Sequence, residues 1–228
     1  MIYIAHRNGL WHRSSPKFAE STLRGYIYVT QIYSELGGIE CDIHKTLDEQ
    51  LVISHDPIVY IGGRYHMIRN SLYKDIQYYF CTLDNLLHSL RELPKVLYFI
   101  DIKEKDCESQ LFPLLQKYDL LQDRRCHLVS MDPTIVQTCL KWKRQYPNAV
   151  LNIGQNFDVF EIPHKDLDFC SWNWKVYLRH YCSIKSIQKP HYVYTINSLI
   201  GKWIYQTIFK CDGIFTDRIH FFLQGTSF

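Results

Sequence analysis

Short apolar runs recur along the chain, and polar segments with a helical period separate most of them. The runs are rich in Val, Ile, Phe and Tyr, the residues that favour strands. They are close to continuously apolar, which is typical of a parallel sheet covered by helices. Nine runs of this kind can be identified, at residues 2–6, 39–43, 51–55, 96–102, 126–130, 149–154, 168–172, 192–196 and 213–217.

Helical periodicity falls between these runs. Residues 82–92 begin with Thr82, a suitable N-cap, and their leucines fall on one stripe. The other segments with a helical period are 19–36, 107–121, 132–147 and 197–210. The alternation of strands and helices predicts an α/β fold.

One gap is too short for a crossover helix. Residues 46–50 (TLDEQ) separate the second and third runs, so these two runs should form an antiparallel hairpin. Eight strands remain when the second arm is counted as an extension. The pattern therefore predicts a (β/α)8 TIM barrel with a short β-hairpin extension after strand 2. The alternative is a doubly wound open sheet, but no Gly-rich phosphate fingerprint follows the first strand.

The composition is that of one ordinary globular domain. The chain has 228 residues, of which 46% are hydrophobic and 21% charged. No repeat or low-complexity tract divides it, so we expect a single domain over residues 1–228. Residues 58–80 are the least regular stretch, and we predict a loop there over one end of the fold. The net charge of +3 is scattered, which argues against a nucleic-acid partner.

Targeting signals are not visible in the sequence. No apolar run reaches the ~18 residues that a membrane span requires, and His6 interrupts the N-terminal apolar run. These features predict a cytoplasmic protein. The eight cysteines include no CxxC pair, so we expect reduced thiols that mostly serve as small core residues.

Reactive side chains stand at the ends of several predicted strands. In a barrel of this kind, such residues project from the C-terminal ends of the strands. Side chains two apart on a strand share a face, and both Glu40–Asp42 and Asp101–Lys103 have this spacing. The candidates at these strand ends are His6, Arg7, Glu40, Asp42, His55, Asp56, Asp101, Lys103 and Asp217.

The combination of these groups points to metal-assisted hydrolysis of a phosphate ester or diester. Three carboxylates on neighbouring strands would repel one another, and a divalent cation such as Mg²⁺ or Ca²⁺ resolves this. Arg7 and Lys103 would supply positive charge for an anionic substrate. Two histidines near the metal could move protons at neutral pH. Each residue alone has a structural explanation, but their recurrence at one end of successive strands favours a site.

The order of the motifs resembles that of the glycerophosphodiester phosphodiesterase family, whose members are (β/α)8 barrels. The matching segments span nearly the whole chain. They are AHRNG (5–9), AEST (19–22), IECD (39–42), TLDEQ (46–50), VISHD (52–56), TLDNLL (82–87), IDIK (100–103), YTIN (194–197) and DGIFTD (212–217).

The resemblance implies a role for each candidate. It implies one divalent cation held by Glu40, Asp42 and Asp101, and a phosphate contacted by Arg7 and Lys103. His6 and His55 would be the general acid and base, with the assignment between them left open. The implied reaction is hydrolysis of a glycerophosphodiester to an alcohol and glycerol 3-phosphate, with the alcohol and the oligomeric state also left open.

Several positions depart from the family pattern. Asp101 stands where the family has Glu, Ser21 where it has Asn, and Tyr194 where it has Trp, while Asn8 precedes or replaces the motif glycine. The segment after His55 is short, which suggests an open site able to take lysophospholipids.

Two alternatives to the glycerophosphodiester reaction follow. One is phospholipase-D-like action on lysophospholipids, with weak contact to a membrane surface. The aromatic candidates for such a rim are Trp172, Trp174, Tyr177 and the Trp11–Arg13 segment. The other is a catalytically inactive barrel that binds a phosphorylated ligand, which the Asp101 change would favour. A barrel of unrelated chemistry would leave the ordered motifs unexplained.

Overall fold

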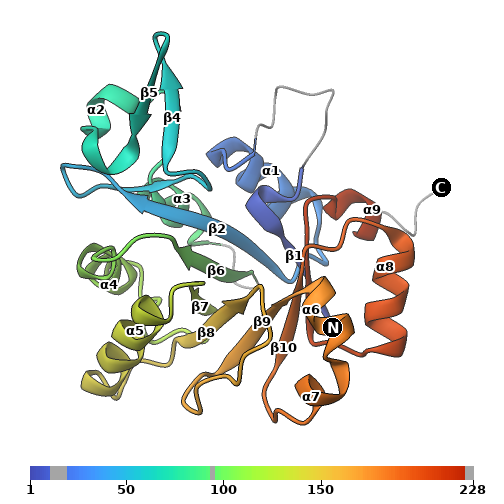
Figure 1. Ribbon diagram of the computed structural model, residues 1–228. Helices are drawn as coiled ribbons and strands as arrows, with labels where there is room; N and C mark the ends of the chain where they lie inside the picture. The colour runs from blue at the N-terminus through green and yellow to red at the C-terminus, as the bar shows by residue number, and fades with distance from the viewer. Residues whose placement is uncertain (11–19, 93–95, 224–228) are drawn as a thin grey trace.

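A closed barrel of parallel strands forms the centre of the molecule in the computed structural model, which describes residues 1–10, 20–92 and 96–223 (Figure 1). Eight parallel strands of these residues close the barrel in the order β1-β2-β6-β7-β8-β9-β10-β11, and β11 pairs with β1. The predicted TIM barrel is confirmed. The strands are β1 Ile2–Ala5, β2 Gly38–Lys45, β6 Leu97–Ile102, β7 Cys126–Val129, β8 Asn152–Phe157, β9 Phe169–Asn173, β10 His191–Tyr194 and β11 Gly213–Thr216.

The predicted hairpin extension is also present. β3 (Leu51–Ile53) pairs antiparallel with the end of β2, with Ile43 opposite Ile53. The chain then passes His55 and leaves the barrel. The hairpin therefore brings residues 54–57 back to the end of the barrel at which β2 finishes.

The prediction of a loop over residues 58–80 is wrong, because a second hairpin begins there. β4 (Ile58–Ile61) pairs antiparallel with β5 (Arg64–Met67) in a separate two-stranded sheet. Gly62 and Gly63 connect the strands, and both have the positive φ that the common two-residue hairpin turns favour. A 3₁₀ turn at Ile68–Asn70 and the short helix α2 (Tyr73–Ile76) follow. Figure 1 shows this hairpin projecting from the body of the molecule.

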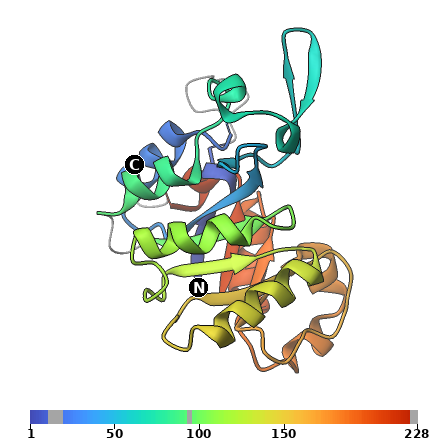
Figure 2. The same cartoon turned by 90° about the vertical axis from the view of Figure 1, so that its left-hand side faces the viewer.

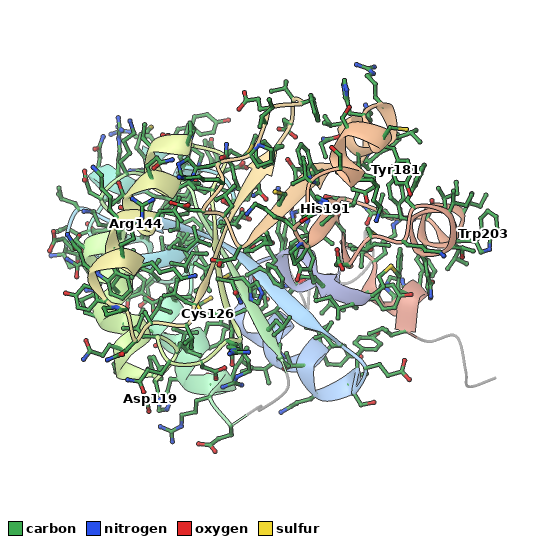
Figure 3. The ribbon with its side chains drawn as sticks, turned by 90° about the horizontal axis from the view of Figure 1, so that it is seen from below. Asp119, Cys126, Arg144, Tyr181, His191 and Trp203 are labelled. Atoms are coloured by element: carbon green, nitrogen blue, oxygen red, sulfur yellow. The ribbon has the colours of Figure 1, made fainter. Side chains whose placement is uncertain are left out.

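Helices cover the outside of the barrel, and Figure 2 shows the green to yellow ones, α3 to α5, along its outer face. Thr22 and Thr82 cap α1 and α3, each accepting a hydrogen bond from the backbone N–H three residues on. The sequence pattern missed α6 and α7, which are short. The helices are α1 Leu23–Ile32, α3 Leu83–Leu90, α4 Glu108–Lys117, α5 Pro133–Gln145, α6 Trp174–Arg179, α7 Tyr181–Lys185, α8 Leu199–Trp203, its π-helical continuation Ile204–Ile208, and α9 Ile219–Leu223. In Figure 3, Tyr181 and Trp203 lie on the outer helices α7 and α8.

A plug of aromatic side chains fills the barrel interior. Phe99 on β6 is its centre, with ring centroids 4.5 Å from His127, 5.2 Å from Tyr192 and 5.2 Å from Phe215. Gly154 leaves room for this plug, because a Cβ there would lie 2.4 Å from the ring of Phe169. Phe99 precedes Asp101 by two residues on the same strand, so the plug forms the floor beneath the polar residues.

The larger part of the core lies between the strands and the helices. All eight cysteines are free thiols, and the four that the sequence placed in apolar runs (Cys41, Cys126, Cys170 and Cys211) are buried. Among the described residues, no helix has the length and apolar character needed to cross a membrane.

Candidate active site

The turn after β1 presents His6 and Arg7 to the barrel mouth. Arg7, Asn8 and Gly9 have φ values of 50°, 76° and 66°, so three successive residues adopt left-handed conformations. Asparagine tolerates this region better than most residues, and Asn8 packs so closely on α1 that a Cβ at Gly25 would lie 2.3 Å from its Nδ2. The turn directs the Arg7 backbone N–H to Glu40 Oε2, at 3.0 Å.

Three buried carboxylates lie together at the ends of β2 and β6. Asp42 and Asp101 are direct neighbours in the β2–β6 register, and Glu40 is on the same face of β2 as Asp42. One carboxylate oxygen from each residue lies within 4.8 Å of the others. Burial and the neighbouring Asp42 raise the pKa of Glu40 to about 8. Burial also raises the pKa of Asp101, followed by repulsion from Asp42.

Two cations contact this cluster. Lys103 Nζ lies 2.8 Å from Asp42 Oδ1 and 2.6 Å from Asp101 Oδ2. Arg7 Nε is 3.4 Å from Asp42 Oδ2, and Arg7 Nη1 is 2.7 Å from Glu20 Oε1. Burial alone would lower the pKa of Lys103, but the two aspartates outweigh it and raise that pKa. The cations therefore remain charged at the edge of the acidic cluster.

The cluster fits a hard divalent cation. Asp42 Oδ2 and Asp101 Oδ1 are buried and have no hydrogen-bond partner among the described residues. Buried carboxylate oxygens without a hydrogen bond are costly, and oxygen-only donor sets are what Mg²⁺ and Ca²⁺ prefer. Glu40, Asp42 and Asp101 could therefore hold such an ion between them.

The two histidines reach the site from different sides. His6 Nδ1 lies 2.5 Å from Asp217 Oδ1, and its Nε2 lies 3.9 Å from Glu40 Oε2. Burial lowers the pKa of His6, but Glu40 and Asp217 outweigh it, so that the pKa is raised. His55 is more open: its Nδ1 is 2.8 Å from Asp56, and its carbonyl oxygen is 3.2 Å from Nε2 of the buried His44.

Asp217 is the residue whose role sequence reasoning missed. The sequence shows only that it ends the last strand, in the DGIFTD motif. In the structure Asn197 holds it, with Asn197 Nδ2 donating to Asp217 Oδ2 at 2.7 Å and the Asp217 N–H donating to Asn197 Oδ1 at 2.9 Å. Burial alone would raise the pKa of Asp217, but the hydrogen bond and charge of His6 outweigh it and lower that pKa.

One cavity of about 380 Å³ brings all seven predicted residues together. It is lined by His6, Arg7, Glu40, Asp42, His55, Asp101 and Lys103, and on its other side by residues that include Asn156, Asp158, Asn173, Trp174 and Tyr194. Asn156 Nδ2 donates to Asp101 Oδ2 at 3.0 Å. Tyr194 and Asn173 both donate to Asp158 Oδ1, at 3.0 and 3.1 Å.

The predicted aromatic rim is only partly present. Trp174 lines the cavity and is 38% exposed. Trp172 and Tyr177 are fully buried in the core, so their prediction as rim residues is wrong. The Trp11–Arg13 segment and Ala19 of the AEST motif lie outside the described residues.

Comparison with known proteins finds similarity at the level of structure. No protein-family model and no curated protein matches the sequence. Among solved structures, a putative glycerophosphodiester phosphodiesterase from Galdieria sulphuraria is 16% identical, with 98% of each chain covered and a TM-score of 0.78. A glycerophosphodiester phosphodiesterase from Thermotoga maritima is 18% identical, with 98% of this chain and 97% of that chain covered and a TM-score of 0.76.

A third similar structure contains a ligand. It is an Oleispira antarctica phosphodiesterase in complex with the product sn-glycerol-3-phosphate. It is 17% identical, covers 96% of this chain and 93% of its own, and has a TM-score of 0.75. The chain therefore has the TIM-barrel fold of these phosphodiesterases along nearly its whole length.

Proposed function

We propose that this chain is a metal-dependent glycerophosphodiester phosphodiesterase. It would hydrolyse a glycerophosphodiester to an alcohol and glycerol 3-phosphate. The observation that carries the proposal is the single cavity in which three buried carboxylates, two cations and two histidines meet. The names of the similar solved structures, one of which holds glycerol 3-phosphate, support the substrate class.

The acidic cluster and the cations would bind the phosphodiester. Glu40, Asp42 and Asp101 would hold one divalent cation, Mg²⁺ or Ca²⁺, which when bound offsets negative charge on the phosphate. Arg7 offers a planar guanidinium from a turn that Glu40 fixes, and Lys103 a point charge held by Asp42 and Asp101. Both line the cavity, and there they would orient the phosphate oxygens.

The histidines would move the protons. Asp217 accepts a hydrogen bond from Nδ1 of His6, which leaves Nε2 as the atom available on the Glu40 side. His55, held through its backbone by His44, faces the same cavity. One histidine would take the proton of the attacking oxygen, and the other would protonate the departing alcohol.

Lysophospholipids are the second candidate substrates. The exposed Trp174 at the cavity favours them, because an indole ring is suited to an acyl chain or a lipid interface. A catalytically inactive barrel has less support, since both histidines and all three carboxylates line the cavity.

The direct test is alcohol release by the purified chain. Glycerophosphocholine, glycerophosphoethanolamine and a lysophosphatidylcholine would each be supplied with Mg²⁺, with Ca²⁺ and with EDTA. Turnover should depend on the metal and be lost in His6→Ala and Glu40→Ala, while His88→Ala on the exposed side of α3 should keep it. Metal binding without turnover of any diester would support the inactive barrel instead.

A further inference from the structure

The β4–β5 hairpin has an apolar face that the barrel does not use. Ile58 is directly opposite Met67, and Tyr60 is directly opposite Tyr65, so these four side chains share one face. The rings of Tyr60 and Tyr65 are 5.0 Å apart, and the two residues are 59% and 79% exposed. No described residue packs over this face in the hydrophobic clusters of the fold.

The opposite face anchors the hairpin. Val59 and Ile61 pack against a small cluster formed by Val52, Ile68 and Ile76. This cluster holds the hairpin to β3 and α2 without Tyr60 or Tyr65. The exposed face is therefore not needed to hold the hairpin in place.

Positive charge prevails along the hairpin and the turn that follows it, between the flanking acids Asp56 and Asp75. Residues 58–74 include Arg64, Arg69 and Lys74 and contain no Asp or Glu. All three cations are exposed, and none makes an ion pair within the described residues. Tyrosines prefer the interface between water and lipid, and exposed Lys and Arg are attracted to anionic headgroups.

We propose that the β4–β5 hairpin docks the protein on an anionic phospholipid surface. Tyr60, Tyr65 and Ile58 enter the interfacial layer, while Arg64, Arg69 and Lys74 contact the headgroups. The charge favours lipid over a second copy of the chain, because two such faces would bring like charges together. His55, which lines the cavity, lies three residues before Ile58, so docking would hold the cavity close to the membrane surface.

The test is binding of the full chain to vesicles, which does not depend on turnover. Vesicles of phosphatidylcholine with phosphatidylserine and vesicles of phosphatidylcholine alone would be sedimented with the protein at low and at high salt. We expect binding to the mixed vesicles that weakens with salt. Arg64→Gln should weaken it about fivefold, the effect of one cation near an anionic leaflet. Tyr60→Ser combined with Tyr65→Ser should weaken it at least tenfold.

Matched controls lie at the opposite end of the barrel. Tyr146→Ser and Arg91→Gln change an exposed tyrosine and an exposed arginine that follow α5 and α3, and vesicle binding should not change. Light scattering on the protein without vesicles tests whether a second copy of the chain covers the face instead. Absence of binding to mixed vesicles overturns the proposal. So does a wild-type dimer that dissociates in the Tyr60→Ser, Tyr65→Ser variant. An unchanged circular dichroism spectrum would show that each variant is folded, so that weaker vesicle binding comes from the altered surface.

Discussion

The imidazole Nδ1 of His6 lies 2.5 Å from the Oδ1 of Asp217, although 211 residues separate the two along the chain. Pairing of β1 with β11, in which Ala5 is opposite Thr216, brings them together. Asn197 fixes the aspartate from its other side. A histidine with one nitrogen hydrogen-bonded to a carboxylate has a defined tautomer and orientation, so Asp217 would be a positioning residue for His6 in the proposed proton transfer.

Asp217→Asn should lower kcat on a glycerophosphodiester about 10–100-fold, by analogy with the loss of a carboxylate that orients a metal-bound histidine. Asparagine keeps the size and one acceptor oxygen, so the fold and the KM should change little. The measurement is steady-state kinetics at saturating metal. Asp119→Asn, an exposed position after α4, is the control and should behave as wild type. An unchanged kcat in Asp217→Asn would mean that the contact does not orient His6 for catalysis.

Glu40→Gln should stabilise the metal-free protein. Because burial raises the pKa of Glu40 from about 4.5 to about 8, unfolding becomes easier as pH rises between these values. Glutamine removes this cost while it can still accept the hydrogen bond from the Arg7 N–H, so the free energy of unfolding at pH 7 should rise by about 1–3 kcal/mol.

Thermal unfolding of Glu40→Gln and wild type checks this, first in EDTA and then with Mg²⁺ or Ca²⁺. The wild type should gain Tm on adding the ion, and the variant should gain little, because one ligand charge is gone. Equal Tm gains in both proteins would show that Glu40 does not hold the ion.

His127 should make the fold sensitive to mild acid. It is buried against Phe99, and burial lowers its pKa to about 4. Below the unfolded pKa of about 6.5, the unfolded chain binds a proton at this residue and the folded chain does not. The free energy of unfolding should therefore fall by up to about 3 kcal/mol between pH 6.5 and pH 4.

Urea unfolding at several pH values would measure the pH dependence. His127→Phe keeps an aromatic ring but cannot titrate, so its free energy of unfolding should fall less over this pH range. Some loss should remain, since burial also lowers the pKa of His191. If the free energy of unfolding fell equally with pH in wild type and His127→Phe, His127 would not be the cause of the acid sensitivity.

Phe99→Ala should cost about 3–5 kcal/mol of folding free energy, because the residue is fully buried and the cavity left behind cannot collapse between four other rings. Phe99→Leu should cost less. Since Asp101 lies two residues on along β6, Phe99→Ala should also weaken metal binding, measured by calorimetry. Metal affinity equal to wild type would show that the aromatic plug does not support the carboxylate.

The barrel and most of its site could be predicted because they depend on local patterns. Apolar strand runs fixed the strand positions, and the two-residue spacing of Glu40 and Asp42 placed both carboxylates on one face. The hairpin after β2 followed from a connection too short for a helix. These signals need no knowledge of distant parts of the chain.

The parts that were missed depend on distant contacts or on weak signals. Nothing local to Asp217 indicates that its partner is His6. Trp172 and Tyr177 have the composition of a rim, but tertiary packing buries them. The β4–β5 hairpin carried a signal in Gly62-Gly63, yet each strand has only four residues, and β4 (IVYI) lacks the alternation of polar and apolar residues that marks a half-buried strand.

The closure of the barrel also bears on how the chain is made. β1 leaves the ribosome before β11, which covers the second edge of β1 and is the last strand of the described residues. A nascent chain that has not yet delivered residues 213–216 has an open strand edge, which invites pairing with other chains. His6 then lacks its carboxylate partner as well. Insertion of β11 would thus complete the proposed catalytic site and cover the open strand edge in the same step.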